Sequence, residues 1–63
     1  MKVKVEEEGE VDLEEESTVE DLLKELDYHL DSVVVISDDD PLPLDYNLEK
    51  DMEVKIIPVV SGG

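Results

Sequence analysis

The chain lacks cysteine, and it has one histidine and no basic residue other than lysine. Without cysteine it cannot form a disulfide framework, a zinc ribbon or a thiol nucleophile, so any thioester chemistry needs a partner's thiol. His29 has no thiol or hydroxyl partner and therefore makes no catalytic triad. A chain of 63 residues has room for one small domain and none for an enclosed cleft. We expect a protein that is not an enzyme and that binds no cofactor or metal ion of its own.

Acidic residues dominate the composition. Twenty aspartates and glutamates against five lysines give a net charge of −15, which argues against nucleic acid and anionic membranes as partners. The acidity has two interpretations. It matches a basic groove on a partner enzyme and speeds their encounter, or it keeps the protein soluble in a salt-rich cytoplasm, where a Debye length of ~3 Å at ~1 M salt screens self-repulsion. Acids occur in every segment, which favours the second interpretation.

The N-terminal residues alternate apolar and charged side chains. They lack the continuous apolar stretch of a signal peptide. No segment of the sequence is long and apolar enough to span a bilayer. We therefore expect a cytoplasmic monomer without a membrane partner.

Apolar and charged residues alternate on both sides of Gly9, which predicts a hairpin over residues 1–15. Residues 17–20 follow with the capping-box pattern, in which the Ser17 hydroxyl bonds the Glu20 N–H while the Glu20 carboxylate reaches back. A helix is therefore predicted to begin there. Its apolar residues recur at spacings of three and four and predict a stripe facing the sheet, made of Val19, Leu22, Leu23, Leu26 and Leu30.

The β-branched run 32–37 predicts a central strand. We interpret residues 38–40, three aspartates, as a solvated turn rather than a cation site, because the glycine and terminal glutamate of a calcium loop are missing. Prolines limit residues 41–44 to a short edge segment, and alternation over 52–57 predicts the last strand. This order predicts an α+β domain over residues 1–60, with a mixed four- to five-stranded sheet and one helix packed across one face.

The chain ends on a serine and two glycines directly after an apolar strand, and we interpret residues 61–63 as a flexible tail. A terminal glycine has no side chain to shield its carboxylate, so Gly63 can thread a narrow channel and present an unhindered carbonyl. This carboxylate is ionised at neutral pH and must be activated before it transfers as an acyl group. The residues expected to be recognised with it are Val59, Val60, Ser61 and Gly62. The alternative is a linker stub or a frayed terminus.

Apolar residues outside the core face suggest a second site. On the predicted register, Val34 or Ile36 lies near Ile57 on the sheet face away from the helix, where an exposed apolar surface indicates a docking partner. The predicted partner-binding patch consists of Val34, Ile36, Ile57 and Pro58, with Val59 beyond it. The alternatives are a register shifted by one residue, or apolar residues that reflect strand propensity alone.

The whole pattern resembles the β-grasp fold of ubiquitin-like proteins. With Gly62-Gly63 added, it is similar to the prokaryotic sulfur carriers of the ThiS and MoaD type and to the small archaeal modifier proteins. The most specific segments are residues 41–45, Pro-Leu-Pro-Leu-Asp, and residues 53–63. Two features depart from these families. Three aspartates stand at 38–40, where many members have an Asn-Gly turn, and residues 56–59 lack the aromatics of molybdopterin-synthase subunits.

The resemblance implies that a ubiquitin-activating-type enzyme, using ATP and magnesium, adenylates the Gly63 carboxylate. A sulfur nucleophile on the partner then displaces AMP. A terminal thiocarboxylate would make the chain a sulfur donor for sulfur-accepting biosynthetic enzymes, whereas transfer to lysines of target proteins would make it a covalent modifier. The sequence does not separate these two fates. The rival interpretation is a non-covalent β-grasp interaction module whose tail is never activated.

Overall fold

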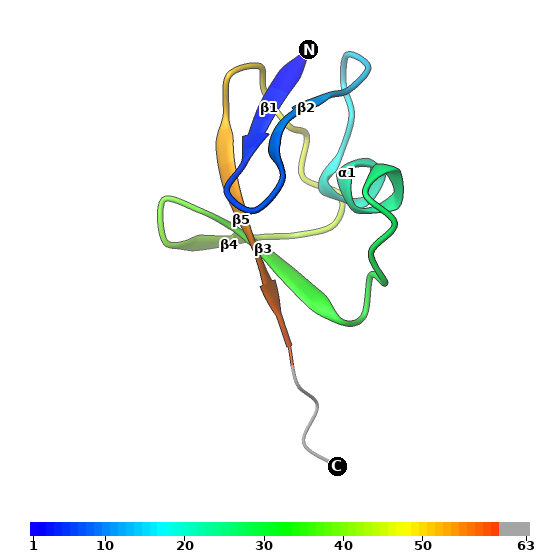
Figure 1. Ribbon diagram of the computed structural model, residues 1–63, viewed down its shortest axis with the longest axis vertical. Helices are drawn as coiled ribbons and strands as arrows, with labels where there is room; N and C mark the ends of the chain where they lie inside the picture. The colour runs from blue at the N-terminus through cyan, green and yellow to red at the C-terminus, as the bar shows by residue number, and fades with distance from the viewer. Residues whose placement is uncertain (60–63) are drawn as a thin grey trace.

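The computed structural model describes residues 1–59. Their elements are β1 (Lys2–Val5), β2 (Gly9–Asp12), α1 (Val19–Glu25), β3 (Val33–Ser37), β4 (Asp40–Leu42) and β5 (Glu53–Pro58). The five strands form one sheet in the order β2-β1-β5-β3-β4, and α1 lies across one of its faces (Figure 1). β1 and β5 are parallel neighbours, whereas the other adjacent strands pair antiparallel. This arrangement is the ubiquitin-like β-grasp fold, which confirms the predicted α+β class.

Alternation of side chains decides which face each strand buries. Val3 and Val5 of β1 are buried, whereas the alternating residues Lys2 and Lys4 are exposed. Val3 pairs with Val11 of β2, so both valines lie on the side covered by the helix. The connecting turn ends at Gly9, whose φ of 82° suits a residue without a Cβ atom. The predicted N-terminal hairpin is confirmed.

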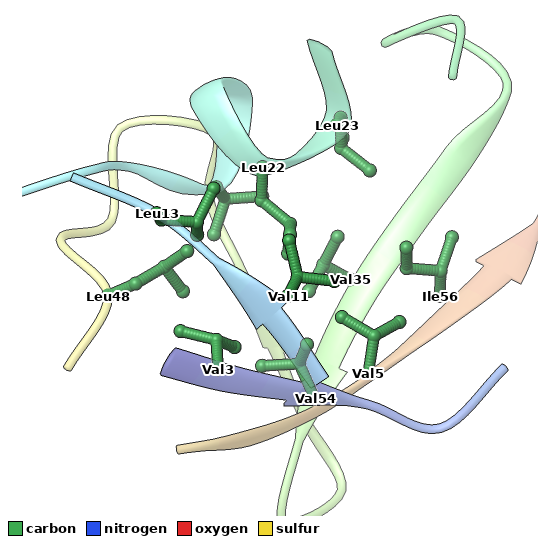
Figure 2. Packing of buried hydrophobic residues seen from close by; sticks show 11 residues of the cluster. Val3, Val5, Val11, Leu13, Leu22, Leu23, Val35, Leu48, Val54 and Ile56 are labelled. Carbon is green, nitrogen blue, oxygen red and sulfur yellow. The ribbon is translucent and has the colours of Figure 1, made fainter. Parts of the chain in front are cut away.

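The core lies between α1 and the helix-facing side of the sheet (Figure 2). Leu22 and Leu23 have no exposed surface, and they pack over the central strands. Burying one aliphatic side chain contributes ~1.5–3 kcal/mol before the entropy of ordering it is subtracted. The buried apolar residues are Val3, Val5, Val11, Leu13, Val19, Leu22, Leu23, Val35, Leu48, Val54 and Ile56.

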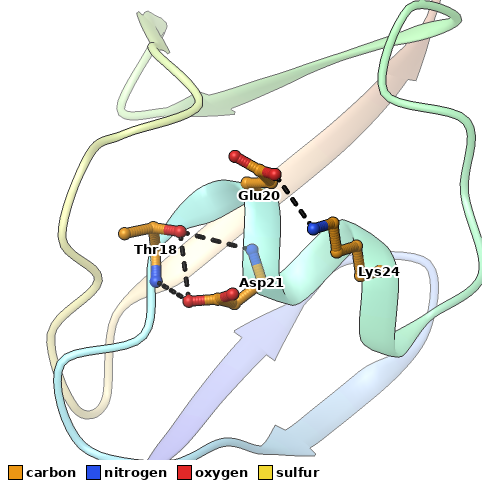
Figure 3. Close-up of polar contacts among 4 residues, drawn as sticks. All are labelled: Thr18, Glu20, Asp21 and Lys24. Carbon is orange, nitrogen blue, oxygen red and sulfur yellow. Dashed lines mark hydrogen bonds and ion pairs between the residues drawn. The ribbon is translucent and has the colours of Figure 1, made fainter.

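The helix begins one residue later than the sequence pattern predicted (Figure 3). Thr18 is the N-cap: its hydroxyl accepts from the Asp21 N–H at 3.3 Å, and the Asp21 carboxylate accepts from the Thr18 N–H at 3.0 Å. The prediction of a Ser17–Glu20 box was wrong. The Ser17 hydroxyl is buried and donates to the Glu14 carbonyl oxygen at 2.6 Å, so it is not free to cap α1. Glu20 instead pairs with Lys24 at 3.0 Å, one helical turn further on.

The helix ends after two turns in a Schellman motif. Asp27 has a φ of 66°, its N–H donates to the Lys24 carbonyl oxygen, and the Tyr28 N–H donates to that of Leu23. Leu26 is therefore the C-cap, and Leu30 lies beyond the helix, where it still packs against the core. All five residues of the predicted apolar stripe therefore contact the core, as predicted. Only Val19, Leu22 and Leu23 of the stripe lie within α1.

The turn between β3 and β4 is built from aspartates in place of the more common Asn-Gly pair. Asp38 and Asp39 have φ angles of 52° and 67°, and Ser37 pairs with Asp40 across them. Two consecutive residues with positive φ are typical of a type I′ hairpin turn, in which aspartate is tolerated better than most side chains. The departure from the family pattern therefore leaves the hairpin intact, and the predicted proline-limited edge strand is present as β4.

We predict that Asp21 titrates below its ordinary pKa of 3.8 and that Thr18→Ala moves it only part of the way back. The Thr18 N–H, and then the Thr18 hydroxyl, hold the pKa of Asp21 down by hydrogen bonding to its carboxylate. Because the folded pKa is the lower one, this stabilisation is complete above the unfolded pKa and is lost as pH falls through the folded pKa. Loss of the cap should also lower the free energy of unfolding by ~1 kcal/mol.

NMR titration of the Asp21 carboxyl and urea unfolding measure these two effects. Ser17→Ala is the matched control, since it removes a neighbouring hydroxyl that does not cap the helix. A pKa that responds to Ser17→Ala and not to Thr18→Ala would contradict the observed cap.

Candidate functional site

The last strand carries the chain out of the domain. β1 pairs with β5 only as far as Val54, whose carbonyl oxygen accepts from the Glu6 N–H at 3.0 Å. On its other side β5 stays paired with β3, and the Val59 N–H still donates to the Ser32 carbonyl oxygen at 2.8 Å. The predicted tail recognition and activation residues Val60, Ser61, Gly62 and Gly63 lie outside the described residues. The sheet thus holds the chain in a fixed direction up to Val59, just before the tail (Figure 1).

Beyond the end of β1, the free edge of β5 is closed by a side chain. Glu7, in the turn after β1, accepts from the Ile56 N–H at 3.3 Å with its carboxylate. Two residues later Pro58 has no N–H to offer, so this stretch presents no free donor on that side. A strand edge without donors is a poor template for an added strand. The approach to the tail is therefore protected against unspecific sheet extension.

The same turn is tied to the segment after α1. The Tyr28 hydroxyl donates to the Glu8 carboxylate at 3.2 Å. Burial, and next the negative charge of Glu8, raise the pKa of Tyr28 above its ordinary value. Glu7 and Glu8 together therefore link three segments around the outgoing strand. No local pattern in the sequence indicates these two bonds, because the partners lie 20 and 49 residues away.

The open face of the sheet, opposite α1, contains most of the predicted partner-binding patch. Val34 pairs with Ile57, and Ile36 pairs with Lys55 of β5, so the alternation of the strands puts Val34, Ile36 and Ile57 on this face. All three are half-buried. Val59, which is 46% exposed, continues the same alternation through its hydrogen bond to Ser32. The predicted register is correct, but a partner is not part of the structure and the patch stays a prediction as a binding site.

Pro58 does not share that face. It pairs with Val33, and both residues follow the alternation of the buried Val35 and Ile56, which lie on the helix side. Placing Pro58 in the same patch as Ile57 was wrong, because adjacent residues of a strand point to opposite faces. The effect of Pro58 is that β5 has no backbone N–H donor at this position, shortly before the tail.

The strands of the open face carry balanced charge. Three lysines, Lys2, Lys4 and Lys55, share this face with three acids, Glu10, Asp12 and Glu53. The other seventeen acids and two lysines therefore account for the whole net charge of −15. Within residues 1–59 the ion pairs are Lys24 with Glu20 and the N-terminal ammonium group with Asp12, so these lysines lie near acids without close pairing. A neutral face with apolar residues stands out on an acidic protein.

Two further properties limit the chemistry of the described part of the chain. Within residues 1–59, no three histidine, aspartate or glutamate side chains are placed so that they could hold a metal ion. The described residues contain one helix, the seven-residue α1, and it is neither long nor apolar enough to cross a membrane. The absence of a bound cofactor stays a prediction.

A five-stranded mixed sheet with one helix across one face is the β-grasp fold of ubiquitin-like proteins. The family model for small archaeal modifier protein 2 matches residues 1–60, and the chain therefore belongs to this family. Its members are small modifier proteins, in agreement with the resemblance found in the sequence. Among curated proteins, none matches the chain.

Proposed function

We propose that the protein is a small archaeal modifier that acts in the cytoplasm as a monomer, and that a ubiquitin-activating-type enzyme adenylates its C-terminal Gly63. Membership of the modifier family supports this proposal most strongly. The course of β5 agrees with it, because the chain stays bonded to β3 up to Val59 and β5 ends at one end of the domain (Figure 1).

In the proposed reaction, a Gly63 carboxylate oxygen attacks the α-phosphorus of ATP, and pyrophosphate leaves with the magnesium ion supplied by the enzyme. A sulfur nucleophile of the partner then attacks the carbonyl carbon and expels AMP. Where the nucleophile is hydrosulfide, the product is a terminal thiocarboxylate for a biosynthetic enzyme. Where it is a partner's thiol, the product is a thioester, and a lysine amine of a target protein then attacks the thioester carbonyl, forms an isopeptide bond and releases the thiol. The domain's contribution is to hold the chain as far as Val59, so that Val60 and the tail residues Ser61 and Gly62 enter the enzyme's channel from a fixed point.

We predict that incubation with ATP, magnesium, a sulfide source and an activating enzyme raises the intact mass by ~16 Da, the exchange of oxygen for sulfur, or yields conjugates joined through Gly63. Deleting Gly62-Gly63 should abolish both products. The double variant Gly62→Ala/Gly63→Ala keeps the length and the terminal carboxylate, and we expect its activation to slow at least tenfold because a methyl group obstructs a channel shaped for glycine.

Mass spectrometry of the intact protein follows these reactions. As a positive control, the same enzyme activates another carrier protein in a parallel reaction. If that control reacts while this protein shows neither a mass change nor conjugates, the non-covalent interaction module is favoured. That alternative also predicts that the tail deletion retains all partner binding.

The open face is the proposed docking surface for the activating enzyme. Its apolar residues Val34, Ile36 and Ile57 can be covered without burying net charge, since the surrounding lysines and acids balance. The excess negative charge lies in the turns and connections and on the outer side of α1. A partner that must desolvate part of this protein therefore meets the lowest cost on the open face.

We predict that Ile57→Asp lowers kcat/KM for adenylation at least tenfold, mainly through KM. The substitution removes the apolar area that docking would still bury and places an unpaired carboxylate in the interface, and these two costs together exceed ~1.4 kcal/mol, a tenfold change. Leu44→Asp is the matched control, because Leu44 is 40% exposed and lies outside the open-face strands. Pyrophosphate release measures the rate and circular dichroism checks the fold. Equal rates for both variants would remove the patch from the proposal.

We also propose that the acidity suits a salt-rich cytoplasm. Most carboxylates of the described residues have no cation within ion-pair distance, and four aspartates and one glutamate occupy backbone positions with positive φ. Mutual repulsion between these exposed carboxylates must weaken the folded state at low ionic strength. A solvent with much salt relieves that repulsion.

Unfolding by urea at KCl concentrations from ~0.1 to ~2 M tests this proposal, because the Debye length falls from ~10 Å to under ~3 Å across the range. We predict a steady rise in the urea midpoint that levels off as screening becomes complete. A constant midpoint, together with activation that slows as salt increases, would instead favour the interpretation that the acids steer the protein to a basic enzyme groove.

A further inference from the structure

A groove lies between the β3–β4 hairpin and the connection that leads into β5. In Figure 1 these two segments are the green hairpin and the yellow-to-orange connection above it. The floor of the groove is formed by Leu42, Tyr46 and Met52, which pack against the core with one side and stay half-exposed on the other. An aliphatic, an aromatic and a thioether side chain together make an adaptable apolar surface. Neither the tail nor the open-face patch includes these residues.

Hydrogen bonds fix the walls of this groove. The Ser37 hydroxyl donates to the Glu53 carbonyl oxygen at 3.0 Å, which joins the hairpin to the start of β5. The Asp51 N–H donates to the Lys2 carbonyl oxygen at 2.7 Å, and the Tyr46 N–H donates to that of Pro43 at 3.1 Å. The groove is therefore already formed in the free protein, so a ligand need not pay for ordering it.

Acidic side chains surround the floor. The groove is lined by five exposed acids, Asp38, Asp40, Glu49, Asp51 and Glu53, and by one lysine, Lys50. None of these six is in an ion pair with another described residue. The combination fits a side chain with an apolar stem and a cationic head, since the stem can lie on the floor while the head meets the carboxylates. The ring of Tyr46 adds an attractive face for a cation.

We propose that this groove binds an extended, lysine- or arginine-containing segment of another protein. A second copy's apolar, anionic C-terminal end has the wrong charge for it, and a nucleic acid would be repelled. The groove begins at Glu53 and β5 ends at Pro58, five residues and ~17 Å further along the strand. A basic segment bound there leaves the tail accessible, so the site can hold a target or enzyme while Gly63 is engaged elsewhere. The proposal does not depend on activation of the tail.

The test is an NMR titration of the full-length, ¹⁵N-labelled chain with an acetylated, amidated peptide of alternating lysine and leucine. The salt concentration is the lowest at which the free protein shows one folded species, so that screening does not hide the interaction. We expect saturable shifts concentrated at Leu42, Tyr46 and Met52. A peptide of alternating lysine and glycine, equal in charge, should bind at least threefold more weakly because it lacks the apolar contacts.

Two charge-matched variants separate a groove from general attraction to an acidic protein. Asp38→Asn/Asp51→Asn removes two charges from the rim, and asparagine tolerates the positive φ of both positions, so the fold is retained. Glu14→Gln/Glu15→Gln removes two charges beside the N-terminus of α1, away from the groove. We expect at least tenfold weaker binding in the first variant and less than twofold in the second.

Tyr46→Leu retains an apolar floor without the aromatic ring and should weaken binding two- to fivefold. Deletion of Gly62-Gly63 should leave binding unchanged. Shifts spread over all acidic segments, equal losses in both double variants, or no saturable binding would each overturn the proposal. Wild-type shift mapping decides the question even if a variant fails to fold.

Discussion

The apolar layer between α1 and the sheet is the interaction on which the rest of the molecule depends. It brings Leu22 and Leu23 onto valines of β1 and β5, strands from opposite ends of the chain. Because those two strands are parallel, their pairing needs the long crossover that contains the helix. Without this layer β5 would have no fixed place, and the open face would not be defined. A chain of this size has no second core to replace it.

The distribution of charge follows from the same layer. Apolar residues fill the inner face, so the charged residues must lie on the open face, on the outer side of α1, and in the turns. Aspartates even occupy backbone conformations that glycine or asparagine more often adopt, as at Asp38 and Asp39. The open face escapes this excess, since its lysines and acids balance. The result is a protein with one neutral, partly apolar surface and an acidic remainder, which gives partners two chemically different sides.

Much of the fold could be predicted from local patterns. Alternation around Val3 and Val5, and the stripe through Leu22 and Leu23, correctly indicated strands and helix, because both patterns repeat within a few residues. The helix cap was misplaced by one residue. Ser17 and Thr18 are both suitable caps, and only the bond from Ser17 to the Glu14 carbonyl oxygen decides between them. Pro58 was placed in the same patch as Ile57, although adjacent residues of β5 point to opposite faces of the sheet.

The sequence by itself determined the class of domain, the negative charge and the character of the di-glycine end, since each depends on residue types and short spacings. Only the tertiary structure decided which residues share a surface. The bond of Glu7 to the Ile56 N–H and the groove over Tyr46 and Met52 join segments distant in the chain. Such contacts depend on strand register and on how the helix closes the core, and no local pattern of residues encodes them.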